Sequence, residues 1–290
     1  MSSRISGVGR SESPVRAKER GRIRECVPEL LKHVRIEETS RRPPLHDQAA
    51  NSARIRGMGT SPSTVAENVA AIQEGVERAA ARAGRKAADV TIVGVSKTFP
   101  AERIREAFEL GIRHFGENRV QEWEFKASVV EGLAATWHLV GHLQRNKAAR
   151  AIRLFHTIDS LDSLPLAEKL SQAAGEGRRL PVLIEVRLDP TVTKTGCNPA
   201  ELSRLVEGVL LMPRLELRGL MTVPEFTADP QEARPVFRRL REMRDAVSRQ
   251  FQCPLPELSM GMSRDFEIAI EEGATQVRLG TALFGARQTR

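Results

Sequence analysis

The chain has 290 residues, of which 40% are hydrophobic and 28% are charged. That composition supplies enough apolar material for a full core and excludes a wholly disordered or collagen-like chain. No apolar run approaches the roughly 18 residues of a membrane span, and the charged N-terminus lacks the apolar segment of a signal peptide, so we expect a protein of the cytoplasm. The three cysteines, Cys26, Cys197 and Cys253, form no C-x-x-C pair, and we interpret them as free thiols.

The formal net charge of +8 is concentrated in the first part of the chain. Residues 1–57 hold 13 Lys and Arg against 7 Asp and Glu, whereas the remaining residues hold 32 against 30. Residues 1–60 are rich in Ser, Arg and Pro and have little hydrophobic periodicity, which predicts a basic, disordered extension. Such an extension could contact nucleic-acid phosphates weakly, but a solvated tail, or a start codon assigned ahead of Met58, is the better interpretation.

From Ser61 the sequence alternates between helix and strand patterns. The run from Ser63 to Ala83 has apolar residues three and four apart, as an amphipathic helix does, and Ser63 with Glu67 is expected to form its capping box. Eight short β-branched or apolar runs follow, and we predict them to be strands: Val90–Val95, Arg113–Gly116, Trp137–Val140, Leu154–Ile158, Val182–Val186, Arg218–Thr222, Glu257–Met260 and Gln276–Leu279. Helices are predicted between them at Glu102–Leu110, Arg119–Glu131, Ser163–Ala174, Pro199–Leu211, Gln231–Arg249 and Phe266–Glu272.

Eight strands with helices between them, after one leading helix, predict a single α/β domain, a (β/α)8 barrel of the TIM type over residues 61–290. A doubly wound open sheet is the competing fold. The barrel is favoured because almost no chain follows the eighth strand. In such a barrel the chemistry belongs to the carboxyl ends of the strands and to the loops that follow them.

A lysine stands at the carboxyl end of the first predicted strand. The two-residue period of a strand puts Val93, Val95 and Lys97 on one face, so Lys97 points into the barrel mouth if the valines face the interior. A lysine in this place can simply reach past the strand end into solvent. If it is partly desolvated, its amine becomes a nucleophile that can form a Schiff base.

The loops after the last two predicted strands have the composition of an anion site. Ser259-Met-Gly-Met-Ser263 follows the seventh strand and Arg278-Leu-Gly-Thr281 the eighth, where many barrels bind phosphate. Ser263 and Thr281 offer hydroxyl donors, although each could serve only as a helix cap. Arg278 needs an acceptor if it faces the interior, either a ligand or a structural salt bridge. Together with Lys97, these residues predict a site for a phosphorylated ligand that carries a carbonyl.

Metal binding and thiol chemistry are not expected. His138 and His142 are four residues apart, but Gly141 lies at a strand end between them, so they do not share the helical face of a zinc motif. His138 either projects from the third strand toward the ligand or packs beside Trp137. Cys197 has no evident histidine partner and is interpreted as an ordinary thiol.

The barrel region also carries a set of short motifs in a fixed order: Val95–Lys97, His114–Asn118 followed by Val120–Glu122, Trp137–His138 with Gly141, Leu143–Gln144 with Lys147, Lys194–Gly196, Leu217–Met221, Leu258–Ser263 with Asp265, and Val277–Thr281 with Phe284–Gly285. With them, residues 62 to 287 resemble the pyridoxal phosphate homeostasis proteins, whose barrel is similar to the N-terminal domain of alanine racemase. The resemblance fails in the leader and at Glu185-Val-Arg187, where the family usually has a Val-Asn pair.

The resemblance implies that the barrel binds pyridoxal 5′-phosphate. Lys97 would hold the aldehyde as a Schiff base, and Arg278 would face the pyridine nitrogen. Ser263, Gly280 and Thr281 would take the phosphate. The full set of cofactor-binding residues expected on this basis is Lys97, Asn118, His138, Met221, Ser263, Arg278, Gly280 and Thr281.

The implied role is intracellular cofactor homeostasis, in which the protein acts as a carrier or buffer for pyridoxal phosphate-dependent apo-enzymes. Racemisation of the alanine-racemase kind uses a second base, a tyrosine from a C-terminal β-domain of the partner subunit. This chain contains no tyrosine and ends nine residues after Thr281. A cationic Arg278 would also oppose protonation of the pyridine nitrogen. We therefore expect no substantial catalysis, with a weak racemase or transaminase-like enzyme as the alternative. The expected oligomeric state is a monomer or weak dimer.

Overall fold

The computed structural model describes residues 64–177, 179–188, 195–225 and 227–286. The extension predicted over residues 1–60, which includes Cys26, lies outside the described residues and stays a prediction. Lys194, which belongs to one of the family motifs, also lies outside them. In the part of the chain that is described, no helix combines the length and the apolar character that a membrane crossing needs.

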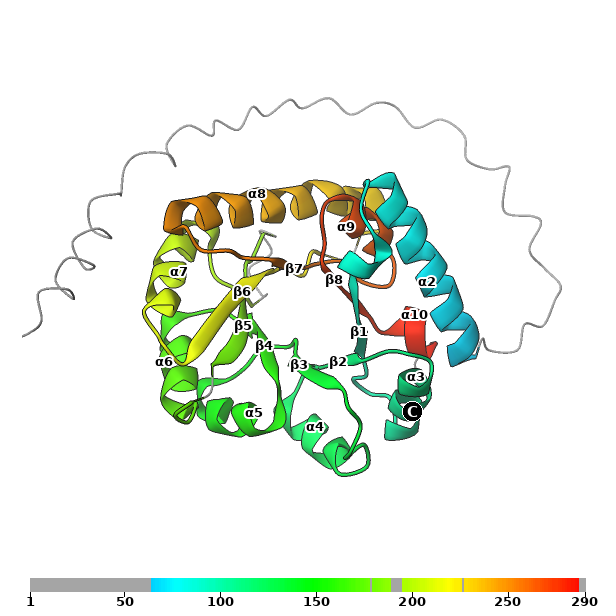
Figure 1. Ribbon diagram of the computed structural model, residues 1–290, viewed down its shortest axis with the longest axis horizontal. Coiled ribbons are helices and arrows are strands. Elements are labelled where there is room, and N and C mark those ends of the chain that lie inside the picture. The colour runs from blue at the N-terminus through cyan, green and yellow to red at the C-terminus, as the bar shows by residue number, and fades with distance from the viewer. Residues whose placement is uncertain (1–63, 178, 189–194, 226, 287–290) are drawn as a thin grey trace, which may run out of the picture. The chain divides into compact units, whose positions relative to one another are not determined.

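Eight parallel strands close into a barrel in the order β1 to β8, and β8 pairs with β1 (Figure 1). The predicted (β/α)8 barrel is confirmed, and the open sheet is wrong because an open sheet leaves two edge strands unpaired. The strands are β1 (Thr91–Val95), β2 (His114–Glu117), β3 (Thr136–Leu139), β4 (Thr157–Leu161), β5 (Leu180–Glu185), β6 (Leu215–Met221), β7 (Glu257–Ser259) and β8 (Gln276–Leu279).

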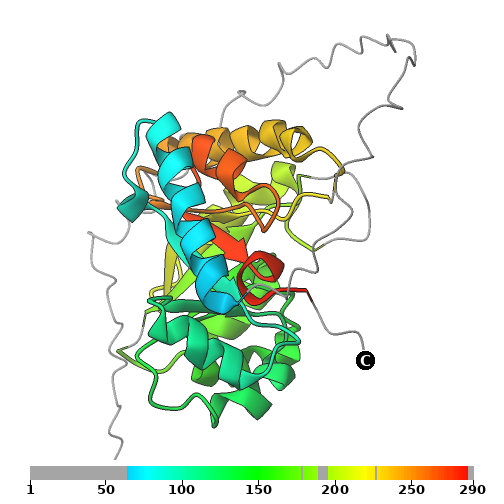
Figure 2. The ribbon, with the colours of Figure 1, turned by 90° about the vertical axis from the view of Figure 1, so that its right-hand side faces the viewer.

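Helices surround this barrel, as Figures 1 and 2 show from two sides. The α-helices are α2 (Val65–Arg82), α3 (Ala101–Glu109), α4 (Val120–Ala127), α5 (Ala148–Leu154), α6 (Leu164–Ala173), α7 (Leu202–Leu210), α8 (Arg234–Phe251), α9 (Phe266–Glu271) and α10 (Thr281–Phe284). Short 3-10 helices are η1 (Ala87–Asp89), η2 (Arg145–Lys147), η3 (Pro199–Glu201) and η4 (Pro230–Ala233). The outer layer covers the outward-facing apolar side chains of the strands, which is why both faces of the strands can be apolar.

The first helix begins with a capping box that differs from the predicted one. Thr64, and not Ser63, is the N-cap: its hydroxyl accepts from the Glu67 amide at 3.2 Å, and the Glu67 carboxylate accepts from the Thr64 amide at 2.8 Å. The prediction was wrong because a capping box needs a spacing of three residues, and Ser63 is four residues before Glu67. The helix then buries its apolar face against the elements that close the barrel, α9 and α10.

The fourth strand begins three residues later than predicted. Leu154 is the last residue of α5 rather than the first of a strand, and the Phe155 amide closes that helix by donating to Ala151. A short apolar run cannot be assigned to helix or strand by periodicity alone, and here the good helix formers before Leu154 decide the outcome. The strand also ends three residues later than predicted, at Leu161 instead of Ile158, which brings Asp159 inside β4.

Gly219 lies where the backbone of β6 packs tightly against that of β7. The register between β5 and β6 shifts between Val182 and Leu183, and Gly219 pairs with both Leu183 and Glu257. A Cβ atom on Gly219 would lie 1.8 Å from the backbone oxygen of Glu257. Backbone atoms cannot rotate aside as a side chain can, so the strand pair tolerates no side chain here.

Gly219→Ala should therefore lower the free energy of unfolding by about 1–3 kcal/mol or more, the cost of forcing extra volume into a packed region. Urea-induced unfolding followed by circular dichroism measures it. The matched control is Gly175→Ala, since nothing lies within 4 Å of the added Cβ there. Equal stabilities of the two variants would contradict the close approach of β6 and β7.

Candidate functional site

A cavity of ≈870 Å³ opens at the carboxyl ends of the strands and brings together six of the eight predicted residues. Its lining includes Lys97, Asn118, Ser263, Arg278, Gly280 and Thr281. The other two predicted residues, His138 and Met221, are buried in the barrel wall and do not belong to that lining. The cavity thus joins the ends of β1, β2, β7 and β8.

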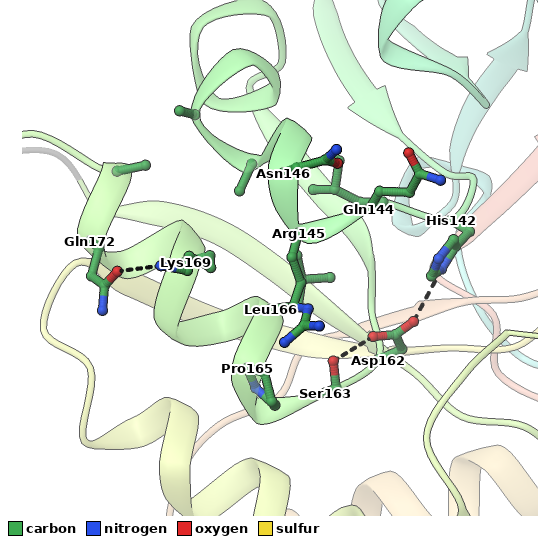
Figure 3. Close-up of a pocket in the computed structure, with 14 residues that line it drawn as sticks. His142, Gln144, Arg145, Asn146, Asp162, Ser163, Pro165, Leu166, Lys169 and Gln172 are labelled. Atoms are coloured by element: carbon green, nitrogen blue, oxygen red, sulfur yellow. Dashed lines mark hydrogen bonds and ion pairs between the residues drawn. The ribbon is translucent and has the colours of Figure 1, made fainter.

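A second cavity, of ≈1100 Å³, lies between the segments that begin α5 and α6 (Figure 3). The side chains of His142 and Asp162 point toward each other there, with Nδ1 and Oδ2 3.2 Å apart, and Lys169 donates to Gln172. None of the eight predicted residues lines it. The chemistry expected from the sequence therefore belongs to the barrel mouth.

Lys97 reaches the mouth because the backbone pairing between β1 and β2 extends one residue beyond the end of β1. The Ser96 amide donates to the Gly116 carbonyl at 3.0 Å, so the backbone is still held against β2 one residue before the lysine. Val95 and Lys97 both line the cavity, in agreement with a face shared at the two-residue period. Lys97 is half-buried, so its amine lies at the boundary between the barrel interior and solvent.

The loop after β7 turns sharply at Gly261, which has φ of +91° and whose Cβ would lie 2.5 Å from that of Ala269. This turn presents Ser263 to α10. The Ser263 hydroxyl accepts from the Ala282 amide at 3.1 Å, so it caps the first turn of α10 from a different loop. The capping alternative is thus part of its role, but a hydroxyl that accepts can still donate its own proton into the cavity.

Arg278 of β8 lines the cavity but is only 5% exposed. Its guanidinium donates to the Ser259 hydroxyl at 2.6 Å and to the Thr222 carbonyl at 2.7 Å. Burial lowers the pKa of Arg278, whereas the carboxylates of Asp159, Glu185 and Asp265 raise it. Arginine stays charged in proteins, so the interior holds a fixed cation.

His138 belongs to a buried chain of polar side chains. Its Nδ1 lies 2.8 Å from Oδ2 of Asp159, and its Nε2 lies 3.0 Å from Nδ1 of His114. Thr157 donates to the other oxygen of Asp159 at 2.8 Å. Because a carboxylate only accepts, a neutral His138 gives its Nδ1–H to Asp159 and accepts at Nε2 from His114. Trp137 packs on Trp123, with ring centroids 4.1 Å apart, and His138 does not belong to the lining of the cavity.

Several residues of the site were not predicted. Val223, Glu225 and Asp265 also line the cavity. Glu225 and Val223 follow the end of β6, so the rule that barrel sites use the loops after the strands could have found them. Asp265 lies in a recognised motif, and its carboxylate accepts from the Met262 amide; burial raises its pKa, while that hydrogen bond and Arg278 lower it.

Comparisons with known proteins agree with this geometry. A family model described as the alanine racemase N-terminal domain matches residues 68–288. A pyridoxal phosphate homeostasis protein of Aquifex aeolicus is 43% identical over 223 residues, which are 77% of this chain and 98% of that protein. The chain belongs to the pyridoxal phosphate homeostasis protein family. A member from Pseudomonas aeruginosa is 43% identical over 226 residues, covering 78% of this chain and 96% of that protein.

A solved structure of PipY from Synechococcus elongatus with PLP bound is similar at a TM-score of 0.69 and 38% identity. The similarity covers 77% of this chain and all of that one. Membership of the pyridoxal phosphate homeostasis family confirms the resemblance carried by the motifs. The family model begins inside α2 and ends beyond α10, so it includes all eight strands and both loops of the mouth.

The connected polar side chains of His114, His138 and Asp159 predict how the stability of the protein depends on pH. Burial lowers the pKa of His114 from its ordinary 6.5 to about 4; His138 lowers it too, and Asp159 raises it. As the pH falls, the unfolded chain therefore binds this proton before the folded one. The contribution of His114 to the free energy of unfolding should be fully present above pH 6.5 and lost between 6.5 and about 4.

Nuclear magnetic resonance titration of the His114 ring gives its midpoint, and urea unfolding at a series of pH values gives the stability. The difference in stability between the unaltered protein and His114→Asn should shrink across that interval. A ring midpoint near 6.5 would contradict the burial argument.

Proposed function

We propose that this protein binds pyridoxal 5′-phosphate at the barrel mouth, linked as a Schiff base to Lys97, and that it carries the cofactor for other enzymes. The observation that carries the proposal is the convergence of Lys97, Ser263, Thr281 and Arg278 around one cavity. These residues come from opposite ends of the described chain, and only closure of the barrel brings them together. PipY, which has PLP bound, supports the choice of ligand.

The residues present fit that cofactor. The cavity volume, ≈870 Å³, lies in the range of small-molecule sites, about 300–1,000 Å³. An amine stands on one side of it, and the hydroxyls of Ser263 and Thr281 stand at the loops where barrels bind phosphate. Hydroxyl donors suit a phosphate because hydrogen bonds to a charged acceptor are the stronger kind.

The chemistry that the cofactor supplies when bound is an aldehyde that exchanges reversibly between amines. Lys97 provides the amine of the protein, and its half-buried position on the cavity lining keeps it within reach of a bound aldehyde. Ser263 and Thr281 hold the phosphate end and so fix the orientation. Asn118, also on the lining, offers an amide from the loop after β2.

Arg278 favours a carrier over an enzyme. Its charge is fixed in the cavity wall by Ser259 and Thr222, and a fixed cation disfavours a second positive charge nearby. An aromatic nitrogen bound close to it would stay unprotonated, which weakens the ring as an electron sink for amino-acid chemistry. The site therefore supports holding and release of the cofactor better than turnover.

The rim of the cavity is open enough for such release. Glu225, Arg264, Thr281 and Ala286 line the cavity and are exposed. A ligand bound beside these exposed residues would be within reach of solvent, free amines or another protein. The relatives named as pyridoxal phosphate homeostasis proteins support this assignment, with pyridoxal phosphate-dependent apo-enzymes as the proposed recipients.

Lys97→Ala should abolish the covalent link and leave weak binding through the phosphate alone. We expect the unaltered protein with pyridoxal 5′-phosphate to show a visible absorption band that borohydride bleaches, with the reduced adduct on Lys97 by peptide mass spectrometry. Lys169→Ala, an exposed lysine on α6, is the control and should keep the band. A Lys97→Ala protein with the same reducible band would overturn the proposal.

Ser263→Ala and Thr281→Ala should each weaken pyridoxal 5′-phosphate binding roughly ten- to a hundredfold. The physical reason is the loss of one hydrogen bond to a charged group, worth about 1.5–3 kcal/mol. Equilibrium dialysis with pyridoxal 5′-phosphate and with unphosphorylated pyridoxal measures both affinities, and the pyridoxal affinity should change little.

Ser203→Ala provides the matched control. Ser203 of α7 donates to Gln250 of α8, and neither residue lines the cavity. Equal losses for the two ligands in Ser263→Ala would show that the hydroxyl only caps α10.

A further inference from the structure

The turn that carries Lys97 has an unfavourable backbone conformation. The Phe99 amide donates to the Ser96 carbonyl at 3.1 Å, so Lys97 and Thr98 are the two central residues of a tight turn. Thr98 has φ of +66°. Glycine or asparagine is the usual residue there, and a β-branched side chain is strained in this region. A strained residue persists only where its surroundings hold it in place.

Three side chains from β2 and α4 hold this turn from the outside. Lys126 donates to the Ser96 carbonyl at 2.8 Å, to Oε1 of Glu117 at 3.0 Å and to Oε1 of Glu122 at 3.3 Å. The same Glu122 oxygen accepts from the Thr98 amide at 2.6 Å. Oε1 of Glu117 accepts from the Ser96 hydroxyl at 2.8 Å. The residues on both sides of Lys97 are therefore fixed by one connected set of contacts.

This set is buried at considerable cost. Glu117 is 0% exposed, the Lys126 side chain is 14% exposed, and Oε2 of Glu117 has no hydrogen-bond partner within the described residues. Burial raises the pKa of Glu117, while Lys126 and the Ser96 hydroxyl lower it. Buried charge with an unsatisfied oxygen is unfavourable for stability alone. These three side chains contact Ser96 and Thr98 on either side of Lys97, which points to a role at the turn.

The helix that carries Lys126 does not depend on these contacts for its packing. Val120 and Trp123 of α4 are buried, and the Trp123 indole donates to the Leu154 carbonyl at 3.1 Å. These two buried side chains and the indole hydrogen bond hold α4 against the barrel. Lys126 can therefore be changed with its helix in place, and its bonds to Ser96 and Glu122 act on the turn.

We propose that Lys126, through Glu117 and Glu122, is a positioning residue that fixes the Ser96–Phe99 turn and so aims the Lys97 amine into the cavity. The inference rests on the proposed function and deepens it. Lys126 does not line the cavity and so acts through the backbone of the turn. Loss of this support should affect steps that need the amine in place, and it should leave phosphate binding unchanged.

The test compares Lys126→Met with Lys169→Met, an exposed lysine of α6 that donates to Gln172. Lys126→Met keeps the length of the stem and removes all three donors. We expect the reducible adduct with pyridoxal 5′-phosphate to form more slowly, by up to roughly a hundredfold, as for a displaced reacting group. Binding of pyridoxamine 5′-phosphate, which has no aldehyde, should stay unchanged. Lys126→Arg, which keeps charge and donors, should recover part of the rate.

Two further measurements separate this inference from the proposed function. In the protein without cofactor, reductive methylation of Lys97 followed by peptide mass spectrometry gives the pH profile of its reactivity, which Lys126→Met should change. In a Lys97→Ala background, Lys126→Met should have no further effect on affinity for either ligand. If no cofactor adduct forms in the unaltered protein, the proposed function fails, and the methylation profile still decides the role of Lys126.

Glu122→Ala is the second variant in case Lys126→Met does not fold. It removes the acceptor of the Thr98 amide, so hydrogen exchange of that amide should accelerate and adduct formation should slow. The inference is overturned if the Lys126 and Lys169 variants behave alike, or if Lys126→Met weakens both phosphorylated ligands equally.

Discussion

Arg278 lies in the interior of a closed barrel, and the residue is only 5% exposed. Because arginine cannot lose its proton, the strands around it must supply acceptors and opposite charge. A hydroxyl and a backbone carbonyl accept its N–H groups, and Asp159, Glu185 and Asp265 counter the effect of burial on its pKa. The interior is therefore polar where many barrels are filled by branched apolar side chains.

Other polar groups of the interior are connected to that cation. Asp159 is one of its counter-charges and also accepts from His138, which continues to His114. On the other side, Val93 of β1 pairs with Arg278 of β8, and Lys97 follows four residues later toward the mouth. The permanent cation and the Lys97 amine thus come from neighbouring strands of the barrel. In the proposed function, Arg278 would set the charge of the cavity and Lys97 would form the bond.

Local patterns in the sequence predicted the barrel and most of the mouth. Strand periodicity placed Lys97, and the loops after β7 and β8 placed Ser263 and Thr281, because each depends on a few consecutive residues. Contacts between distant segments could not be predicted in this way. The hydrogen bond from Lys126 to the Ser96 carbonyl joins α4 to the end of β1. The turn that it holds has a positive φ at Thr98, which a threonine in the sequence does not predict. Asp159 was missed because the boundary of β4 was misplaced.

The pairing of β8 with β1 has a consequence for how the protein is made. The amine at the mouth belongs to the first strand of the barrel, and the guanidinium and hydroxyls belong to the last two strands and their loops. A growing chain on the ribosome therefore has no complete site until its final strand has emerged and docked. A small molecule that contacts both β1 and β8 would bind only the closed barrel and would therefore stabilise it by mass action. Loading with ligand would thus mark chains in which the first and last strands of the barrel have paired.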